Sequence, residues 1–186
     1  LVSQFLSPHT NQRTDKWGGS AEHRREFVLA VYREIRRQVG DDFPIGIKLN
    51  SADFQKGGFT EEESLEVIKQ LEKEGIDHVE ISGGTYEQPS MSGKEIRDST
   101  KQREAYFLQF AEKIRSEVKV PLAVTGGFRT AKAMNAALSS GSLDMVGLAR
   151  PLAVDTQYPN KLLAGKIIDI NVNPIKTGIK AIDKMA

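Results

Sequence analysis

Four short apolar segments alternate along the chain with longer segments in which apolar residues recur every three or four positions. The short segments, residues 44–49, 78–82, 121–125 and 144–148, are rich in Val, Ile and Leu, as buried strands usually are. Their starts lie about 33, 43 and 23 residues apart, a spacing typical of successive βα units. The pattern therefore predicts four strands connected by helices.

The intervening segments carry helix start and stop signals. One predicted helix begins at Ser20 and stops at Gly40, and a second runs from the capping box of Thr60 and Glu63 to Gly75. Two shorter helices are predicted over 106–114 and 130–138, and further helical pieces over 161–163 and 175–185.

Alternating strands and helices predict the α/β class, with a parallel sheet covered by helices. We expect the strands to lie in sequence order with right-handed crossovers. A (β/α)8 barrel needs eight strands and typically about 250 residues. The chain is thus either a small open α/β sheet or half of a TIM barrel. Residues 1–19 have the pattern of a long polar loop, and a loop without its strand favours the half-barrel. Residues 1–186 are expected to form a single domain.

Composition narrows the class of function. The 26 Lys and Arg residues nearly balance the 25 Asp and Glu residues, which argues against nucleic acid or a membrane as the main partner. The absence of cysteine excludes disulfides, thiol nucleophiles and iron–sulfur clusters. His9, His23 and His78 are too far apart for a metal-ligand motif. With no signal peptide and no apolar run near 18 residues, we expect a cytoplasmic protein that acts on a small molecule.

Two glycine-containing turns directly follow the last two predicted strands, at 125–128 and 147–151. Glycine lets the backbone approach a ligand closely, and free amides at such turns favour a phosphate. Arg150 can add a bidentate contact to the anion. The alternative is a pair of tight turns with a surface arginine. We expect four residues to mark the carboxyl ends of the strands: Lys48, Ser82, Thr125 and Gly147.

Other candidates lie within the first predicted strand or directly after the first two strands. Lys48 lies inside an apolar strand, where it either faces negative charge on a cofactor or extends to solvent. Thr85 and Tyr86 begin a long polar loop and are candidates to line a substrate pocket, although a flexible loop is the alternative. Asp53 and Phe54, which follow the first strand, are candidates of the same kind, with the same alternative.

The opening segment, from Phe5 to Ser20, closely resembles the old yellow enzyme family after its fourth barrel strand. The shared motif is Phe-Leu-Ser-Pro, then Asn-x-Arg-Thr-Asp, then an aromatic residue and Gly-Gly-Ser. The turns Thr-Gly-Gly-Phe and Gly-Leu-Ala-Arg-Pro match the two phosphate loops of that family in order. Ile-Ser-Gly-Gly-Thr-Tyr-Glu-Gln-Pro resembles a subgroup of NAD(P)H-dependent flavin oxidoreductases.

This resemblance implies an FMN-containing (β/α)8 barrel, of which the chain is the C-terminal half. NADH or NADPH would reduce the flavin, whose N5 passes a hydride to the β-carbon of an activated alkene, often an enone. By the same resemblance Lys48 stands where the family usually has an arginine beside flavin N1 and O2, which keeps the charge but loses the planar fork. The residues implied in FMN phosphate binding are Thr125, Gly126, Gly127, Ala149 and Arg150.

The family's proton-donating tyrosine and its pair of substrate-carbonyl ligands would lie upstream of Leu1, so the resemblance implies no catalytic residue in this chain and no activity of the chain alone. A second hypothesis is a non-catalytic phosphate-binding half-barrel that self-associates through exposed edge strands. A third is a barrel enzyme without flavin that shares the phosphate site. The expected partners are a small-molecule substrate and a possible second copy of the chain.

Overall fold

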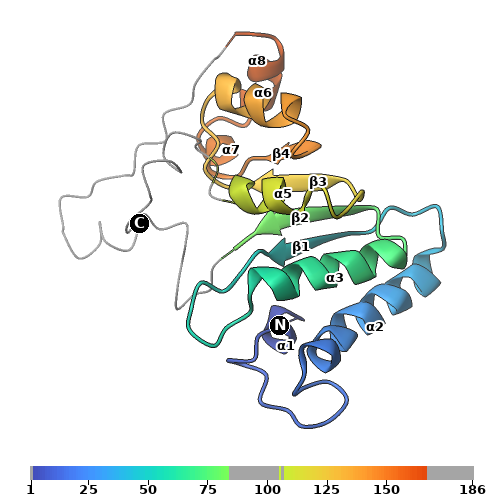
Figure 1. Ribbon diagram of the computed structural model, residues 1–186. Coiled ribbons are helices and arrows are strands. Elements are labelled where there is room, and N and C mark those ends of the chain that lie inside the picture. Colours follow the sequence, from blue (N-terminus) through green and yellow to red (C-terminus); the bar gives the residue numbers. More distant parts are fainter. Residues whose placement is uncertain (1, 84–104, 106, 167–186) are drawn as a thin grey trace.

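The computed structural model describes residues 2–83, 105 and 107–166. Its centre is a parallel sheet of four strands in the order β1-β2-β3-β4, which confirms the predicted class and strand order (Figure 1). The strands are β1 (Gly46–Asn50), β2 (His78–Ser82), β3 (Leu122–Thr125) and β4 (Met145–Gly147).

Helices α2 and α3 begin and end where their capping residues predict. The Ser20 side chain accepts from the His23 amide at the start of α2, and Thr60 and Glu63 form the reciprocal capping box of α3. The predicted piece at 175–185 lies outside the described residues. The described helices are α1 (Val2–Leu6), α2 (Ala21–Val39), α3 (Glu61–Lys73), α5 (Leu108–Ile114), α6 (Ala131–Ser139), α7 (Arg150–Val154) and α8 (Tyr158–Leu163).

The expectation of an uninterrupted loop over residues 1–19 is wrong, because α1 occupies its beginning. The Phe5 ring stacks on Phe27 of α2 with 3.9 Å between the ring centroids. Leu6 is buried in the core. Asn11 then donates from Nδ2 to the carbonyls of Phe5 (2.7 Å) and Trp17 (2.8 Å). A helix of five residues is too short to be stable alone, so these tertiary contacts hold it.

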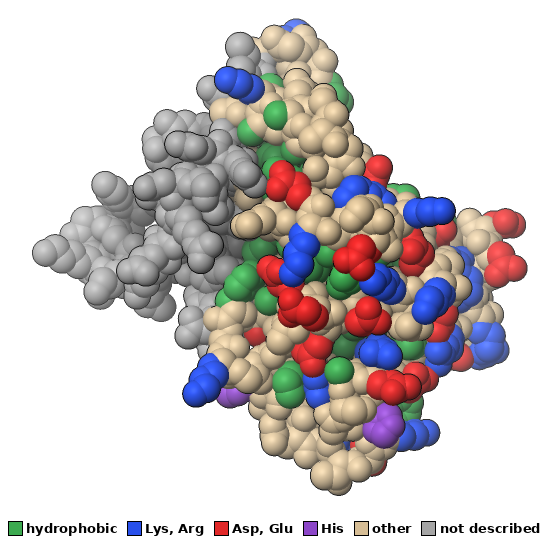
Figure 2. All heavy atoms as spheres, viewed as in Figure 1, with side chains coloured by type: hydrophobic (Ala, Val, Ile, Leu, Met, Phe, Trp, Pro, Cys, Tyr) green, Lys and Arg blue, Asp and Glu red, His purple; other side chains and the backbone are tan. Residues whose placement is uncertain are grey.

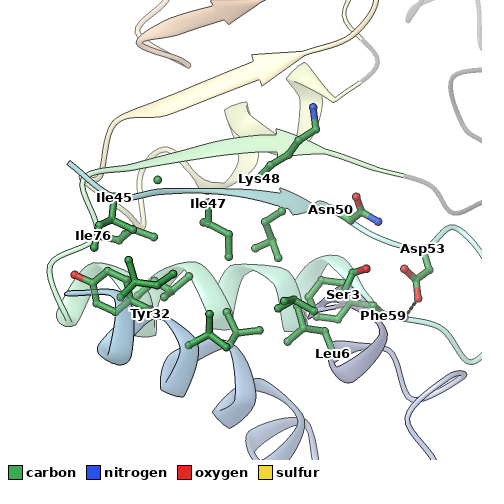
Figure 3. A pocket seen from close by; sticks show the side chains of 17 residues that line it. Ser3, Leu6, Tyr32, Ile45, Ile47, Lys48, Asn50, Asp53, Phe59 and Ile76 are labelled. Atoms are coloured by element: carbon green, nitrogen blue, oxygen red, sulfur yellow. Dashed lines mark hydrogen bonds between the residues drawn. The ribbon is translucent and has the colours of Figure 1, made fainter. Parts of the chain in front are cut away.

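The two faces of the sheet differ in character. Val79, Ile81, Leu122 and Val124 point to the helix side and are at most 1 % exposed. Residues that alternate with them point to the opposite face, which we call the open face and define by Lys48, Glu80, Thr125 and Met145. Figure 3 shows Ile47 directed toward the helices and Lys48 directed away from them. The Lys48 side chain is 53 % exposed and Met145 is 49 % exposed, so the open face is much less covered than the helix face.

The helix-covered outside carries charges of both signs. Figure 2 shows acidic and basic side chains interspersed over the region of α2 and α3. Arg33 of α2, for example, pairs with both Glu26 and Glu74. Such mixing matches the near-zero net charge and leaves no field of one sign on this face. No helix in the described ranges is long and apolar enough to cross a bilayer.

Candidate functional site

The two glycine turns begin side by side at the carboxyl edge of the sheet. Thr125 and Gly147 are the last residues of β3 and β4 and are paired partners in the parallel register. A Cβ atom on Gly147 would overlap Thr125 Oγ1 and lie 2.8 Å from the Thr125 Cβ. Only glycine fits this close approach. The predicted adjacency of the two turns at one edge is confirmed.

The backbone of the first turn has an unusual conformation. Gly126 and Gly127 have φ angles of 115° and 96°, a region that L side chains rarely adopt. The turn is anchored on both sides, because Phe128 is fully buried and Thr130 caps α6 by accepting from the Ala133 amide. Consecutive backbone amides fixed in such a turn can converge on an anion.

The second glycine turn leads into helix α7, and Arg150 is the first residue of that helix and is exposed. Within the described residues no ion pair or hydrogen bond engages its guanidinium, whereas Arg115, at the C-terminal end of α5, is held by Asp144 at 2.9 Å and by the Val118 carbonyl at 2.6 Å. An arginine without an internal partner beside a glycine turn is available for an external anion.

Lys48 does not lie at a strand end as predicted. It is the central residue of β1, two positions before Asn50, whereas Ser82, Thr125 and Gly147 do end their strands. Its Nζ lies 2.6 Å from Glu80 Oε1 on the open face. Lys48 therefore neither extends freely to solvent nor stands alone.

Glu80 was not among the sequence candidates. It is directly opposite Lys48 in the parallel register, since each is the third residue of its five-residue strand. Burial acts to raise the pKa of Glu80, but hydrogen bonds from Lys48 and Thr125 outweigh it, so the net pKa is lowered and the carboxylate stays ionised. The two residues meet only in the observed register of β1 and β2, which the strand patterns in the sequence do not specify.

The two candidates after β1 have different surroundings. The Asp53 carboxylate is buried and accepts from the Phe59 amide (2.9 Å), while its own amide donates to the Phe59 carbonyl (3.0 Å). Asp53 therefore braces its own loop. Phe54 has a φ of 57°, is half exposed, and stacks on Phe107 with 6.3 Å between centroids. Thr85 and Tyr86 lie outside the described residues.

A cavity of about 420 Å³ lies away from the glycine turns. It runs along the edge strand β1, between that strand and α1 and α2 (Figure 3). Its lining is mostly aliphatic, with Leu6, Val28 and Ile47 among the residues, and Tyr32 closes one end with its hydroxyl bonded to the Glu74 carbonyl at 3.0 Å. The cavity suits apolar side chains and offers little to an anion.

The opening motif serves the fold. Arg24 is buried and donates from Nε to the Leu6 carbonyl at 2.9 Å, and it also binds the Gly19 carbonyl and the Glu63 carboxylate. It thus joins α1, the opening loop, α2 and α3. Asp15 accepts from the Trp17 amide, and its bond with Arg13 lowers the Asp15 pKa.

Comparison with known proteins now defines the class. Residues 1–167 match the NADH:flavin oxidoreductase / NADH oxidase family, and the chain belongs to that family. It is 40 % identical over 171 residues to the NADH-dependent flavin oxidoreductase iccE of Talaromyces variabilis, covering 88 % of this chain and 41 % of that protein. The chain therefore spans less than half the length of this relative.

Solved structures of related oxidoreductases have the same fold as this chain over most of its length. A 2-naphthoyl-CoA reductase superposes with a TM-score of 0.79 at 33 % identity, over 89 % of this chain and 25 % of that one. The old yellow enzyme homologue from Zymomonas mobilis superposes with a TM-score of 0.69 over 92 % of this chain and 45 % of its own, at 21 % identity. The sheet is thus a section of a (β/α)8 barrel, and the expected old yellow enzyme relationship is confirmed. FMN and NADH are the cofactors of this family.

Proposed function

We propose that this chain supplies the FMN phosphate site and part of the flavin-facing surface of an NAD(P)H-dependent oxidoreductase that reduces activated alkenes such as enones. The observation that carries the proposal is the pairing of Thr125 with Gly147, which starts both glycine turns at neighbouring points of one sheet edge. Barrel enzymes commonly build phosphate sites from the loops of two neighbouring strands at this end.

The residues present fit a phosphate group. Gly126 and Gly127 adopt a backbone conformation that brings bare amides to the turn, and Gly147 leaves no room for a side chain beside Thr125. Arg150 adds an exposed guanidinium without an acidic partner among the described residues. The phosphate would be held by the amides of Gly126, Gly127, Ala149 and Arg150 and by the Arg150 side chain.

Bound FMN would supply hydride transfer between the nicotinamide and the alkene. Lys48 would contribute its positive charge on the open face, where it stabilises negative charge that develops on reduction. Thr125 would fix the start of the first phosphate turn, since it ends β3 and bonds to Glu80.

Loss of Arg150 in the complete enzyme tests the phosphate site. Arg150→Ala should weaken FMN binding by about 1.5–3 kcal/mol, the value of a hydrogen bond to a charged group, or about 10- to 150-fold in Kd. Arg37→Ala removes the same charge from an exposed position on α2 and should leave Kd unchanged. Equal Kd values for both variants and the parent enzyme would refute the phosphate site.

Lys48→Met in the same enzyme separates binding from reduction. We expect a slower flavin reduction by NADH in stopped-flow measurements with a much smaller change in FMN affinity. If affinity falls and the reduction rate is unchanged, Lys48 is a binding contact and its proposed electrostatic role is wrong.

The open edges of the sheet favour the second hypothesis, a self-associating phosphate-binding module. β1 and β4 each pair with one strand among the described elements, and the aliphatic cavity runs along β1. Sedimentation of the 186-residue chain tests it: a concentration-dependent dimer that binds inorganic phosphate but not FMN supports the module. A monomer that binds FMN contradicts it.

A further inference from the structure

The open face carries a chain of polar contacts across three neighbouring strands. Lys48 of β1 bonds to Glu80 of β2 at 2.6 Å, and the Glu80 carboxylate also bonds to the Thr125 hydroxyl of β3. Glu80 thus connects a cation to the residue that begins the first glycine turn. Neither the family resemblance nor the sequence motifs assigned Glu80 a role.

Among the described residues, Lys48 is the charged group that Glu80 bonds to directly. Its side chain is 30 % exposed, against 53 % for Lys48, so Glu80 is the more buried partner of the pair. Of the residues that the structure describes, the other titratable group on this face near Glu80 is His78, two residues earlier on β2. From β3, Ala123 and Thr125 face it, and neither is charged. The helices pack on the opposite face of the sheet.

We propose that Glu80 is a positioning residue for Lys48, which fixes the ammonium group on the open face and offsets part of the positive charge offered to the flavin. The inference rests on the proposed function, because it concerns the electrostatic role of Lys48 there. A cation favours the reduced, anionic flavin, and a carboxylate bonded to that cation weakens its field. Glu80 therefore tunes the flavin toward a lower reduction potential than Lys48 alone would give.

The test is the two-electron midpoint potential of FMN bound to the complete enzyme. Glu80→Gln keeps the shape of the side chain and removes its charge, so the equilibrium should shift about tenfold toward reduced flavin, which is about 30 mV for a two-electron couple. Lys48→Met should shift the equilibrium the other way. In the Lys48→Met background, Glu80→Gln should have less than half its effect in the parent enzyme, because its main partner is gone.

Two further variants show whether a shift in the flavin potential is specific to the position of Glu80 or follows from a general loss of structure. Glu74→Gln makes the same chemical change in the ion pair with Arg33 on the outside of the protein, and it should leave the potential unchanged. Glu80→Asp keeps the charge but shortens the reach to Lys48, so its potential should lie between those of the parent enzyme and Glu80→Gln. It also keeps the test available if Glu80→Gln does not fold.

The outcomes distinguish this inference from the proposed function. If Lys48→Met lowers the potential and neither Glu80 variant changes it, the role of Glu80 is overturned and the proposed function stands. An equal shift in Glu74→Gln also overturns it, because the effect would not depend on position. A complete enzyme that fails to retain FMN refutes the proposed function, and this inference with it.

Discussion

Replacement of Arg24 by methionine should be one of the most destabilising single changes in the described structure. The Arg24 side chain is 7 % exposed, and its guanidinium binds two backbone carbonyls, those of Leu6 and Gly19, and the Glu63 carboxylate. Methionine fills much of the volume but leaves all three acceptors without their donor. Breaking a buried charged pair in this way costs about 3–5 kcal/mol of unfolding free energy.

Urea unfolding followed by circular dichroism measures this loss. With a denaturant slope of about 2 kcal/mol per molar urea, a loss of about 4 kcal/mol lowers the midpoint by about 2 M. Arg24→Met combined with Glu63→Gln should cost less than the two single changes summed, because the second removes the carboxylate that the first leaves unpaired.

Arg33→Met is the matched control. Arg33 lies on the same helix and also pairs with carboxylates, but its side chain is 50 % exposed. Exposed pairs contribute about 0–1 kcal/mol each, so the midpoint should move by less than about 1 M. If Arg33→Met and Arg24→Met lower the midpoint equally, burial does not determine the cost and the reasoning fails.

Three other changes probe the strands and loops. Gly147→Ala should lower stability by about 1–3 kcal/mol and weaken FMN retention, because its Cβ would lie 2.8 Å from the Thr125 Cβ; an unchanged melting temperature contradicts the close packing. Asn11→Ala removes the hydrogen bonds to the carbonyls of Phe5 in α1 and of Trp17, and it should cost about 1–3 kcal/mol in urea unfolding; a loss below that range would mean that water replaces them. A hydrogen bond from the Ile45 amide is the main cause that lowers the pKa of Asp77 below its ordinary value of 3.8, so ionised Asp77 stabilises the fold above that pH and this stabilisation is lost on acidification. In Asp77→Asn, the urea midpoint should therefore fall less between pH 7 and pH 3 than it does in the parent protein. An equal fall in both proteins would exclude this role of Asp77.

The sequence predicted those parts of the fold that depend on local signals. The capping box of Thr60 and Glu63 and the glycine stop at Gly40 act within one helical turn, so the ends of α2 and α3 could be derived without any tertiary information. The aliphatic strands were equally clear, because buried parallel strands are apolar on the helix side. The two glycine turns of the candidate site followed directly from these strands.

Other features depend on contacts between distant segments. Helix α1 exists because Phe5 meets Phe27, a contact that no periodicity within residues 1–19 encodes. The ion pair of Lys48 and Glu80 joins positions far apart in sequence and depends on the exact register of two strands. Lys48 lies two residues before the end of β1 and not, as predicted, at the end, because a sequence pattern locates a strand more precisely than it locates the ends of that strand.

The alignment of the strands also limits which changes of chain length this region can accept. Side chains alternate between the two faces, so the loss or gain of one residue inside β2 would turn Glu80 toward the buried helices and send Val79 or Ile81 to the open face. A similar change inside β4 would separate Gly147 from Thr125 and admit a side chain between the turns. Insertions and deletions in natural variants should therefore fall between the strands, while the number of residues within β2 and β4 stays constant.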